Sequence, residues 1–409
     1  MSIETKTTQG TAECARLQAR ADALLGIYVQ VPFCQTKCTY CNFHTGVVSG
    51  ARFAPYVAAV CKEIREWRGL YRAAGLRSGE GSLFATDTIY IGGGTPSLLE
   101  PRLLAQMMEA IRGTFGGELL EVTLEADPET VTEQKARAWV EAGINRVSFG
   151  VQSFVDRELA AAGRMHRRED VYRAFAFLRA AGIGNISFDL IAGLPWQTRE
   201  SWRESLEELR RLGPEHVSVY LLEVDEGSRL GKELLSSGKR YGAGAVPSDD
   251  EMAEFYELAC AFLRAAGYRH YEISNWARPG FESRHNLKYW NRELYLGFGA
   301  GAHSFAGGER WANAHDAAEY VRAIESGRLP VEQRENVTAE MALEEELFLG
   351  LRKLAGIDLR KIEEEYGVDL GARIAPLENS GLVEREGDVV RLTEDKLSVS
   401  NEVFVGLMK

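Results

Sequence analysis

Short segments of β-strand type alternate with amphipathic helical segments from residue 26 onward. Several of the helical segments end in Gly, which is the usual residue just past a helix C-terminus. Successive β-then-α units need right-handed crossovers and therefore build a parallel sheet. The candidate strands are residues 27–31, 88–92, 120–126, 146–152, 186–191 and 216–222.

Six such units predict an α/β protein built on a partial (β/α)6 barrel of the TIM type, because the closed barrel needs eight units. A doubly wound sheet is the alternative that hydrophobic periodicity alone does not exclude. We expect residues 26–315 to form this barrel. Residues 1–25 have no apolar core of signal-peptide type and are expected to be a poorly ordered extension.

The β/α alternation stops at about residue 315. Helical patterns then precede the segment GLVEREGDVVRLTE, a hairpin candidate with Gly387-Asp388 at its turn. Three helices followed by a hairpin resemble a small winged-helix domain. Because the region is not basic, we expect residues 316–409 to be an α+β packing or lid module. The helical patterns are residues 338–354, 358–366 and 369–379.

The composition limits the classes of function. The chain has 409 residues with 45% hydrophobic and 26% charged residues, as in ordinary soluble proteins. Its net charge of −12 argues against a nucleic-acid partner. Since we see no export signal and no apolar run of membrane-spanning length, we expect a cytoplasmic protein in a reducing compartment. Clustered cysteines are then read as metal ligands rather than disulfides.

Polar residues follow nearly every candidate strand. Catalytic and binding groups of barrels of this kind gather at the carboxyl ends of the strands. The sequence therefore predicts a binding site at that rim. The residues concerned are the segment GGGTPS (92–97), Glu125 with Asp127, Gln152, Asp189 and Glu223.

Three cysteines, Cys34, Cys38 and Cys41, follow the first candidate strand in a C-x3-C-x2-C pattern. A structural zinc site wants four ligands, and here one pair-like element has no partner. Three buried spectator thiols are implausible in a loop rich in Gln, Thr, Lys and Tyr. A [4Fe–4S] cluster normally takes four thiolates, one per iron. Three cysteines therefore predict a cluster with one iron open to a small molecule.

The motifs around this loop resemble those of the radical S-adenosylmethionine (SAM) superfamily. Within it the chain resembles the oxygen-independent coproporphyrinogen III oxidase group, and in particular its heme chaperones, from about residue 26 to the C-terminus. The resemblance implies that SAM is the fourth cluster ligand, through its amino and carboxylate groups. The motifs are YVQVPFCQTKCTYCNF, IYIGGGTPSLL, LEADPE, RVSFGVQSF, FDLIAGLPWQT, RHNLKYW and GFGAGAHSF.

The same resemblance implies a SAM pocket. Arg164 would pair with the SAM carboxylate, and Asp189 would suit the ribose hydroxyls. Glu223 aligns by spacing only, and Asp127, which precedes a proline, is expected to cap the following helix. The matching positions are Tyr28, Tyr40, Gly93, Gly94, Thr95, Glu125, Gln152, Arg164, Asp189 and Glu223.

Two functions from different classes remain open. One is a coproporphyrinogen III dehydrogenase, which would start oxidative decarboxylation with an adenosyl radical. The other is a heme chaperone that keeps the radical SAM scaffold. The dehydrogenases carry a fourth cysteine where this chain has Phe43, which favours the chaperone.

The segment HNLKYW (285–290) resembles the heme-binding motif of the chaperones. His285 is the expected axial ligand, with Tyr289 or Trp290 against the macrocycle. We expect this segment near the rim that bears the cysteine loop. The expected partners are heme or another porphyrin and an acceptor protein, for which a respiratory, membrane-associated protein is one candidate. A monomer and a homodimer are both compatible with the sequence.

Overall fold

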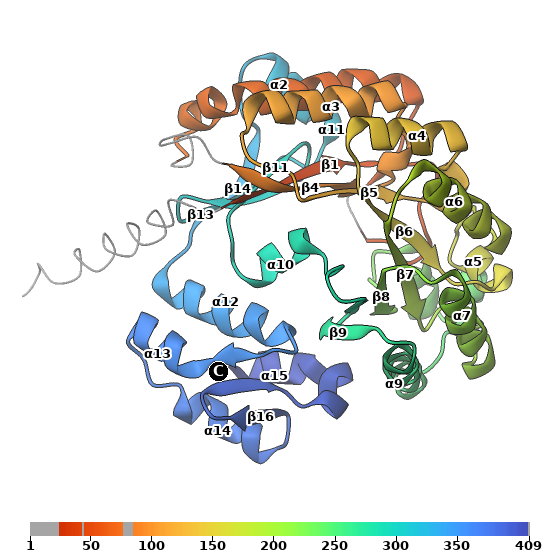
Figure 1. Ribbon diagram of the computed structural model, residues 1–409, viewed down its shortest axis with the longest axis vertical. Coiled ribbons are helices and arrows are strands. Elements are labelled where there is room, and N and C mark those ends of the chain that lie inside the picture. The colour runs from red at the N-terminus through yellow and green to blue at the C-terminus, as the bar shows by residue number, and fades with distance from the viewer. Residues whose placement is uncertain (1–23, 43–44, 77–84, 408–409) are drawn as a thin grey trace, which may run out of the picture.

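A parallel sheet forms the core of the protein, in a computed structural model that describes residues 24–42, 45–76 and 85–407. All six expected strands are present and lie side by side in chain order (Figure 1). They are β1 (Leu25–Val31), β4 (Thr86–Gly93), β5 (Glu121–Ala126), β6 (Arg146–Gln152), β7 (Asn185–Ala192) and β8 (His216–Leu221).

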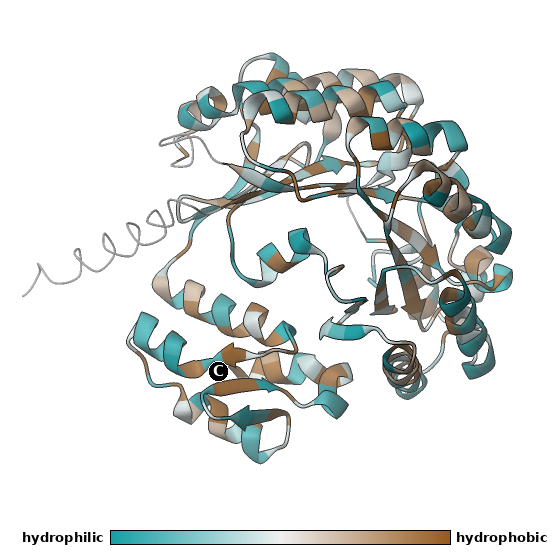
Figure 2. Cartoon of the chain, viewed as in Figure 1, coloured by the Kyte–Doolittle hydropathy of each residue, from teal (hydrophilic) through white to brown (hydrophobic). Residues whose placement is uncertain are grey.

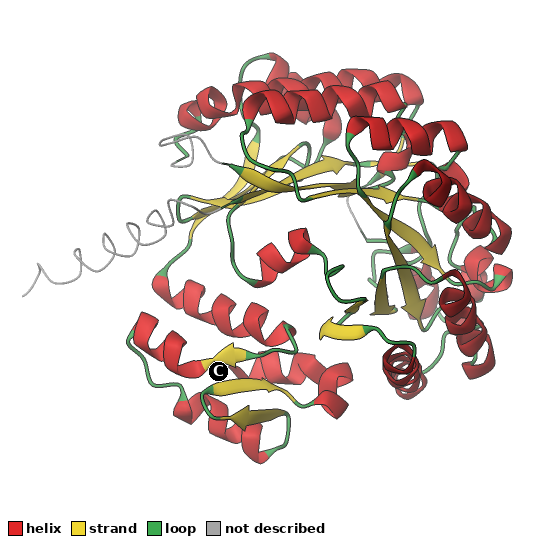
Figure 3. Cartoon of the chain, viewed as in Figure 1, coloured by secondary structure: helices red, strands yellow, loops and turns green. Residues whose placement is uncertain are grey.

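The main helices cover one face of this curved sheet, so the partial barrel is confirmed and the doubly wound sheet, which needs helices on both faces, is excluded (Figures 1 and 3). Gly143 and Gly182 follow two of these helices in the left-handed conformation, at φ 92° and 97°. The helices are α2 (Phe53–Ala73), α3 (Pro101–Thr114), α4 (Glu133–Ala142), α5 (Asp156–Ala161), α6 (Arg168–Ala181), α7 (Arg199–Leu212) and α9 (Asp249–Ala265). The short helix α8 (Arg229–Leu235) lies instead beside the cysteine loop, where Leu230 N donates to Thr39 O.

Side chains alternate along each strand between two different environments. Ile27, Val29, Ile89 and Ile91 are fully buried on the face beneath the helices. Figure 2 shows this face as apolar strands under helices whose outer sides are hydrophilic. The residues between them, such as Tyr90, point to the inner face of the barrel. The inner face is therefore the polar one.

Further strands extend the sheet at both edges. β11 (Tyr295–Phe298) pairs in parallel with β1, and β12 (His303–Ala306), β13 (Glu309–Asn313) and β14 (Val331–Asn336) continue it in antiparallel order. At the other edge β10 (Asn275–Ala277) and β9 (Arg269–Glu272) follow β8. The short helix α10 (Arg284–Trp290) lies on the inner side of the sheet (Figure 1).

The small C-terminal module begins later than expected. α11 (Ala317–Glu325) packs on α2, and β14 pairs with β13, so residues 317–336 belong to the large sheet and its helical layer. The expected boundary at residue 316 thus falls within the larger unit. The antiparallel strands that extend the sheet do not alternate with helices. Their sequence pattern therefore resembles the start of a new domain.

The module itself contains the expected three helices and the hairpin, with Gly387 at the turn in the left-handed conformation. A short strand completes an antiparallel sheet of three. Its elements are α12 (Ala339–Arg352), β15 (Ile357–Asp358), α13 (Leu359–Tyr366), α14 (Gly371–Asn379), β16 (Val383–Glu386), β17 (Val389–Leu392) and α15 (Ser400–Leu407).

Among the helices that the structure describes, none has the length and apolar character needed to span a bilayer. The first 23 residues of the expected N-terminal extension, including Cys14, lie outside the described residues, as does Phe43.

Candidate functional site

A cavity of about 530 Å³ occupies the inner side of the barrel. The cysteine loop and the carboxyl ends of β4 to β8 border it, and Asn286 of α10 reaches it from the inside of the barrel. From the C-terminal module, Arg352, Leu397, Ser398, Ser400 and Asn401 also line it. Its volume lies in the range of small-molecule and cofactor sites.

The cysteine loop is tied to the opposite side of the barrel by backbone contacts. Thr39 donates its backbone N–H to Ala162 O at 2.9 Å and its hydroxyl to Ala161 O at 3.0 Å. Leu230 N donates to Thr39 O at 2.8 Å. These bonds hold a loop of irregular backbone over the mouth of the barrel.

All three motif cysteines line the cavity as partly exposed thiols that form no disulfide among the described residues. Burial raises the pKa of the Cys34 thiol, and hydrogen bonds with Thr45 and Thr95 oppose the rise. In the described part of the chain, no three Cys, His, Asp or Glu side chains are grouped as ligands of a single metal ion. A four-iron cluster instead binds each thiolate through a different iron, so a wider spacing of donors suits it.

The glycines after β4 let the backbone pass close to the cysteine loop. A Cβ atom on Gly94 would lie 2.5 Å from Phe33 O, and one on Gly93 would lie 2.5 Å from the Gln30 side chain. Gly93 also has a φ of 112°, which side chains rarely allow. Thr95 N donates to Phe33 O at 2.7 Å. The expected cofactor segment Gly93–Gly94–Thr95 therefore lies directly against the strand that ends in Cys34.

Glu125 lies beside this turn on the inner face of β5. It accepts hydrogen bonds from Tyr90 OH at 2.9 Å and from Gly93 N at 2.9 Å. Burial raises the pKa of Glu125 to about 7, although both hydrogen bonds oppose the rise. Near neutral pH this carboxyl group can therefore be either a proton donor or an anion beside a cationic ligand.

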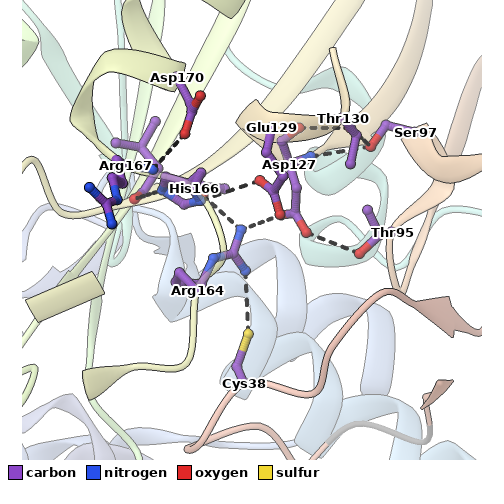
Figure 4. A network of polar contacts seen from close by, with 12 residues as sticks. Cys38, Thr95, Ser97, Asp127, Glu129, Thr130, Arg164, His166, Arg167 and Asp170 are labelled. Carbon is purple, nitrogen blue, oxygen red and sulfur yellow. Dashed lines mark hydrogen bonds and ion pairs between the residues drawn. The ribbon is translucent and has the colours of Figure 1, made fainter. Parts of the chain in front are cut away.

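Asp127 departs from its expected role. It occupies the N-cap position of a short 3-10 helix, Pro128–Thr130, but its side chain makes no capping bond. It instead pairs with the Arg164 guanidinium and accepts a hydrogen bond from Thr95 Oγ1 at 3.1 Å (Figure 4). A buried cation competes more strongly for the carboxylate than the solvated N–H groups of a single helical turn.

Arg164 joins the cysteine loop to the strand ends. Its guanidinium donates to Gly150 O at 2.9 Å and to Cys38 Sγ at 3.4 Å, in addition to the Asp127 pair (Figure 4). The side chain is 9% exposed. The guanidinium therefore ties Cys38 of the cysteine loop to the ends of β5 and β6.

The other expected SAM positions are distributed over the strands. Asp189 lies on the inner face of β7, where burial raises its pKa and bonds from Ser218 and Ser148 oppose the rise. Gln152 ends β6 with φ 64°, and Glu223 is exposed in the loop after β8. Tyr40 packs in a small apolar cluster with residues such as Ile191. All four of these residues line the cavity.

Tyr28 is an expected SAM contact that does not line the cavity. It is on β1 and donates its hydroxyl to Gln30 Oε1, with its ring stacked 6.1 Å from that of Tyr90. Tyr90 lines the cavity and Tyr28 does not. Tyr28 thus supports the cavity wall from behind.

The segment His285–Trp290 lies at the other end of the barrel from the one expected. It forms α10, whose first turn is held by the carboxylate of Glu121 at the start of β5, which accepts from Arg284 N at 2.9 Å and His285 N at 3.0 Å. The strand starts lie opposite the rim with the cysteine loop. The sequence shows the helix but not the direction in which its long preceding segment runs.

His285 is 1% exposed and uses both ring nitrogens within the protein. Nδ1 lies 3.0 Å from Thr88 Oγ1 and Nε2 lies 2.9 Å from Tyr289 OH. Burial, followed by the charges of Lys288 and Arg146, lowers the pKa of His285 to about 3, so the ring is neutral at physiological pH. Trp290 lies 4.5 Å beneath the Arg352 guanidinium.

Several cavity residues have no counterpart among the sequence predictions. They lie on the inner faces of the strands or come from distant segments. The period-two alternation of polar residues, as in R-V-S-F-G-V-Q, is the signal that could have identified those on β6. The set comprises Tyr90, Arg146, Ser148, Ser218, Arg352 and Asn401.

The glycine-rich turn between β11 and β12 belongs to the edge of the sheet beside α2. Gly299 N donates to Glu63 Oε2 at 3.0 Å and Ala300 N to Tyr56 OH at 2.9 Å. Residues 297–304 are not among the residues that line the cavity. The turn packs against α2 instead of facing the ligand site.

The fold and the three-cysteine loop define a radical SAM protein. Residues 28–209 match the family model of the radical SAM superfamily, and residues 337–395 match that of the HemN C-terminal domain. The solved structure of coproporphyrinogen III oxidase (HemN) from Escherichia coli superposes with a TM-score of 0.80 at 22% identity, covering 96% of this chain and 92% of that one. Membership in the superfamily implies a [4Fe–4S] cluster and SAM.

Relatives that align over nearly their whole length specify the family within this superfamily. The chain is 36% identical to the heme chaperone HemW of Bacillus subtilis (strain 168), over 92% of this chain and 97% of the relative. It is 34% identical to the heme chaperone HemW of Mycobacterium tuberculosis (strain ATCC 25618 / H37Rv), over 90% of each chain. The chain therefore belongs to the HemW family of radical SAM proteins.

Proposed function

We propose that this protein is a heme chaperone that binds a [4Fe–4S] cluster, SAM and heme and passes the heme to an acceptor protein. One observation carries the proposal: a single cavity extends from the three cysteines to α10, the helix with the HNLKYW motif. The relatives named heme chaperones, which match nearly the whole chain, support it.

Cys34, Cys38 and Cys41 would hold the cluster, and SAM would complete the coordination of the remaining iron. The cluster can supply one electron to the bound SAM. Gly93, Gly94 and Thr95 would contact the SAM amino group. Their backbone already lies against the strand that ends in Cys34, which supports this assignment.

The remaining SAM contacts would come from the acidic and polar strand ends and from Arg164. Since Arg164 pairs with Asp127, the guanidinium would bind the SAM carboxylate with its remaining N–H groups. Glu125, with a pKa near 7, can present a carboxylate to the cationic sulfonium or ammonium. The proposed set is Tyr28, Tyr40, Glu125, Gln152, Arg164, Asp189 and Glu223.

His285 would be the axial heme ligand, through Nε2. A metal-bound histidine usually donates its other ring N–H to a fixed partner, and Thr88 Oγ1 at 3.0 Å from Nδ1 suits that role. Nε2 lies within hydrogen-bond distance of Tyr289 OH, so binding of iron at Nε2 requires this hydroxyl to move away. Tyr90 separates His285 from the cavity, with ring centroids 5.4 Å apart, so the Tyr90 ring must also shift. Tyr289 and Trp290 would then lie against the macrocycle.

A coproporphyrinogen III dehydrogenase is the second candidate, favoured by the likeness of the fold to HemN. Phe43 argues against it, since the dehydrogenases resembled by this chain have a cysteine there. The acceptor of heme would be an apo-hemoprotein. The reducing cytoplasm is the proposed compartment, because thiols that bind iron must stay reduced there.

The test uses one anaerobically reconstituted sample of the full chain. We expect saturable heme binding, seen as a Soret band, and no conversion of coproporphyrinogen III to protoporphyrinogen in the presence of SAM and a reductant. Turnover of coproporphyrinogen without saturable heme binding would contradict the chaperone and favour the dehydrogenase.

A further inference from the structure

Arg146 is a buried cation whose role the SAM and cluster sites do not explain. It is the first residue of β6 and 1% exposed, and it lines the cavity. Within the described part of the chain, its Nε has no hydrogen-bond partner. A buried guanidinium without full hydrogen bonding is costly, since such charges are normally paired.

The nearby acidic groups are engaged elsewhere. Glu121, on the neighbouring strand β5, accepts the backbone N–H groups of Arg284 and His285 at the start of α10. Asp189 accepts from Ser148 at 3.0 Å and from Ser187 at 3.3 Å. The buried hydroxyl of Thr123, the register partner of Arg146 on β5, is also without a partner among the described residues. Of these two neighbouring side chains, Arg146 is the one that lines the cavity, so its unmatched N–H can be reached by a ligand.

We propose that Arg146 binds a carboxylate of the ligand that enters the barrel, and that this carboxylate is a propionate of the tetrapyrrole. The inference rests on the proposed heme function and specifies how the ligand is oriented. A guanidinium matches a carboxylate with two parallel N–H···O bonds. Asn286 lines the same cavity from α10 and adds a polar group.

SAM also carries a carboxylate, but the proposed partner of that carboxylate, Arg164, contacts Gly150 towards the other end of β6. Six residues separate Arg146 from Gln152, which corresponds to about 20 Å along an extended strand. The cysteine loop borders the end with Gln152, and α10 lies at the end with Arg146. Arg146 therefore lies at the end of β6 nearer the helix that bears the heme motif, away from the proposed partner of the SAM carboxylate.

The experiment compares heme with its dimethyl ester, which has the same iron and macrocycle and no free carboxylate. For the unaltered protein we expect heme to bind about 10- to 100-fold more tightly than the ester, the usual effect of one charge-assisted pair. Arg146→Gln should remove this preference by weakening only the binding of heme, and Arg146→Lys should restore part of it. SAM affinity, read from the EPR signal of the reduced cluster, should stay unchanged in both variants.

Arg164→Gln is the contrasting variant from the same cavity, and it should weaken SAM binding while it keeps the preference for heme over the ester. Equal affinities of the unaltered protein for heme and ester would overturn the inference and leave the heme function standing. Loss of SAM binding in Arg146→Gln would show that Arg146 binds the carboxylate of SAM, and would also overturn the inference. If neither heme nor ester binds, both the proposed function and the inference fail. If Arg146→Gln does not fold, the comparison of heme with its dimethyl ester on the unaltered chain still tests whether a ligand carboxylate is bound.

Discussion

Arg164 illustrates how one residue of the site is restrained by several elements at once. It follows α5, yet its guanidinium contacts Asp127 after β5, Gly150 on β6 and Cys38 in the cysteine loop. Such a network fixes the side chain in one orientation and ties the loop to the barrel. The three cysteines can then bind a cluster without first having to be ordered.

The cysteines provide the first prediction. Replacing Cys34, Cys38 or Cys41 by Ala should abolish the visible absorbance of the reconstituted protein, because a cluster with two protein ligands is not retained. The unaltered chain should hold about four irons. Iron analysis and absorbance on the same sample measure this.

Cys260→Ala on α9 is the matched control and should keep both signals. A full cluster in the Cys38→Ala protein would show that the ligand set is wrong.

Tyr289 provides the second prediction. Its hydroxyl lies 2.9 Å from His285 Nε2, so Tyr289→Phe should free this nitrogen. Heme affinity should rise by about 5-fold, since the bond lost in the free protein is worth roughly 1 kcal/mol. His285→Ala should lose the imidazole-type Soret band. Absorbance titration measures both effects.

Tyr295→Phe makes the same chemical change on the neighbouring ring, 4.7 Å from that of Tyr289, and should leave heme binding as it is. If Tyr289→Phe weakened binding as much as His285→Ala, the tyrosine itself would be the ligand.

Local sequence motifs indicated which residues belong to the site, but not which contacts those residues make in the fold. The cysteines and the Gly93–Thr95 turn follow from short patterns with a direct chemical meaning. The pairing of Asp127 with Arg164 does not, because the two residues are 37 positions apart and meet only through the fold. Arg146 was missed for the same reason, since an arginine at the start of a strand looks like a solvated charge until the sheet curves around it.

At the level of secondary structure, the six β/α units were predictable because their hydrophobic periodicity is strong and local. The edges of the sheet were not. β12 to β14 are short or polar strands that pair in antiparallel order, and β14 exposes most of its residues. Only the pairing with β13 makes this segment a strand, so propensity gives little signal.

A buried carboxylate fixes the junction between α2 and this sheet extension. Glu63, which is fully buried, accepts from Gly299 N at 3.0 Å and Asn313 Nδ2 at 2.9 Å, and also from Tyr320 OH. Its three donors come from β11–β12, β13 and α11. The residue therefore links the helical layer to the antiparallel extension.

Glu63 provides the third prediction, which concerns stability. Burial raises its pKa from 4.5 to about 7, although all three donors oppose the rise. Between these pH values the folded protein holds a proton that the unfolded chain has released. The contribution of Glu63 to the free energy of unfolding should thus fall by about 3 kcal/mol as pH rises from 4.5 to 7.

Glu63→Gln should remove the Glu63 contribution to the pH dependence of the free energy of unfolding. It should also lower stability at all pH values, because the amide N–H groups of Gln would face other hydrogen-bond donors. Urea unfolding at pH 5 and pH 8 measures the difference. Glu125→Gln is the matched control that keeps the Glu63 share. An unchanged pH slope in Glu63→Gln would contradict the account.

In the whole molecule, the cavity is closed by segments that are far apart in the sequence. The cysteine loop lies at residues 34–42, α10 at residues 284–290, and residues 397–401 come from the C-terminal module. The module is thus part of the ligand site as well as a packing unit. Its arrangement could not be derived from local patterns, since no short motif specifies how it meets the barrel.

The central claim is that heme binds in this cavity, between the cysteine loop and the C-terminal module and next to α10. Hydrogen–deuterium exchange of the reconstituted full chain, with and without saturating heme, tests it most directly. Heme should slow amide exchange in α10 and in residues 397–401, because it buries both segments, and should leave α4 on the outer layer unchanged. Protection confined to the outer helices, with no change in α10 at saturating heme, would contradict the claim.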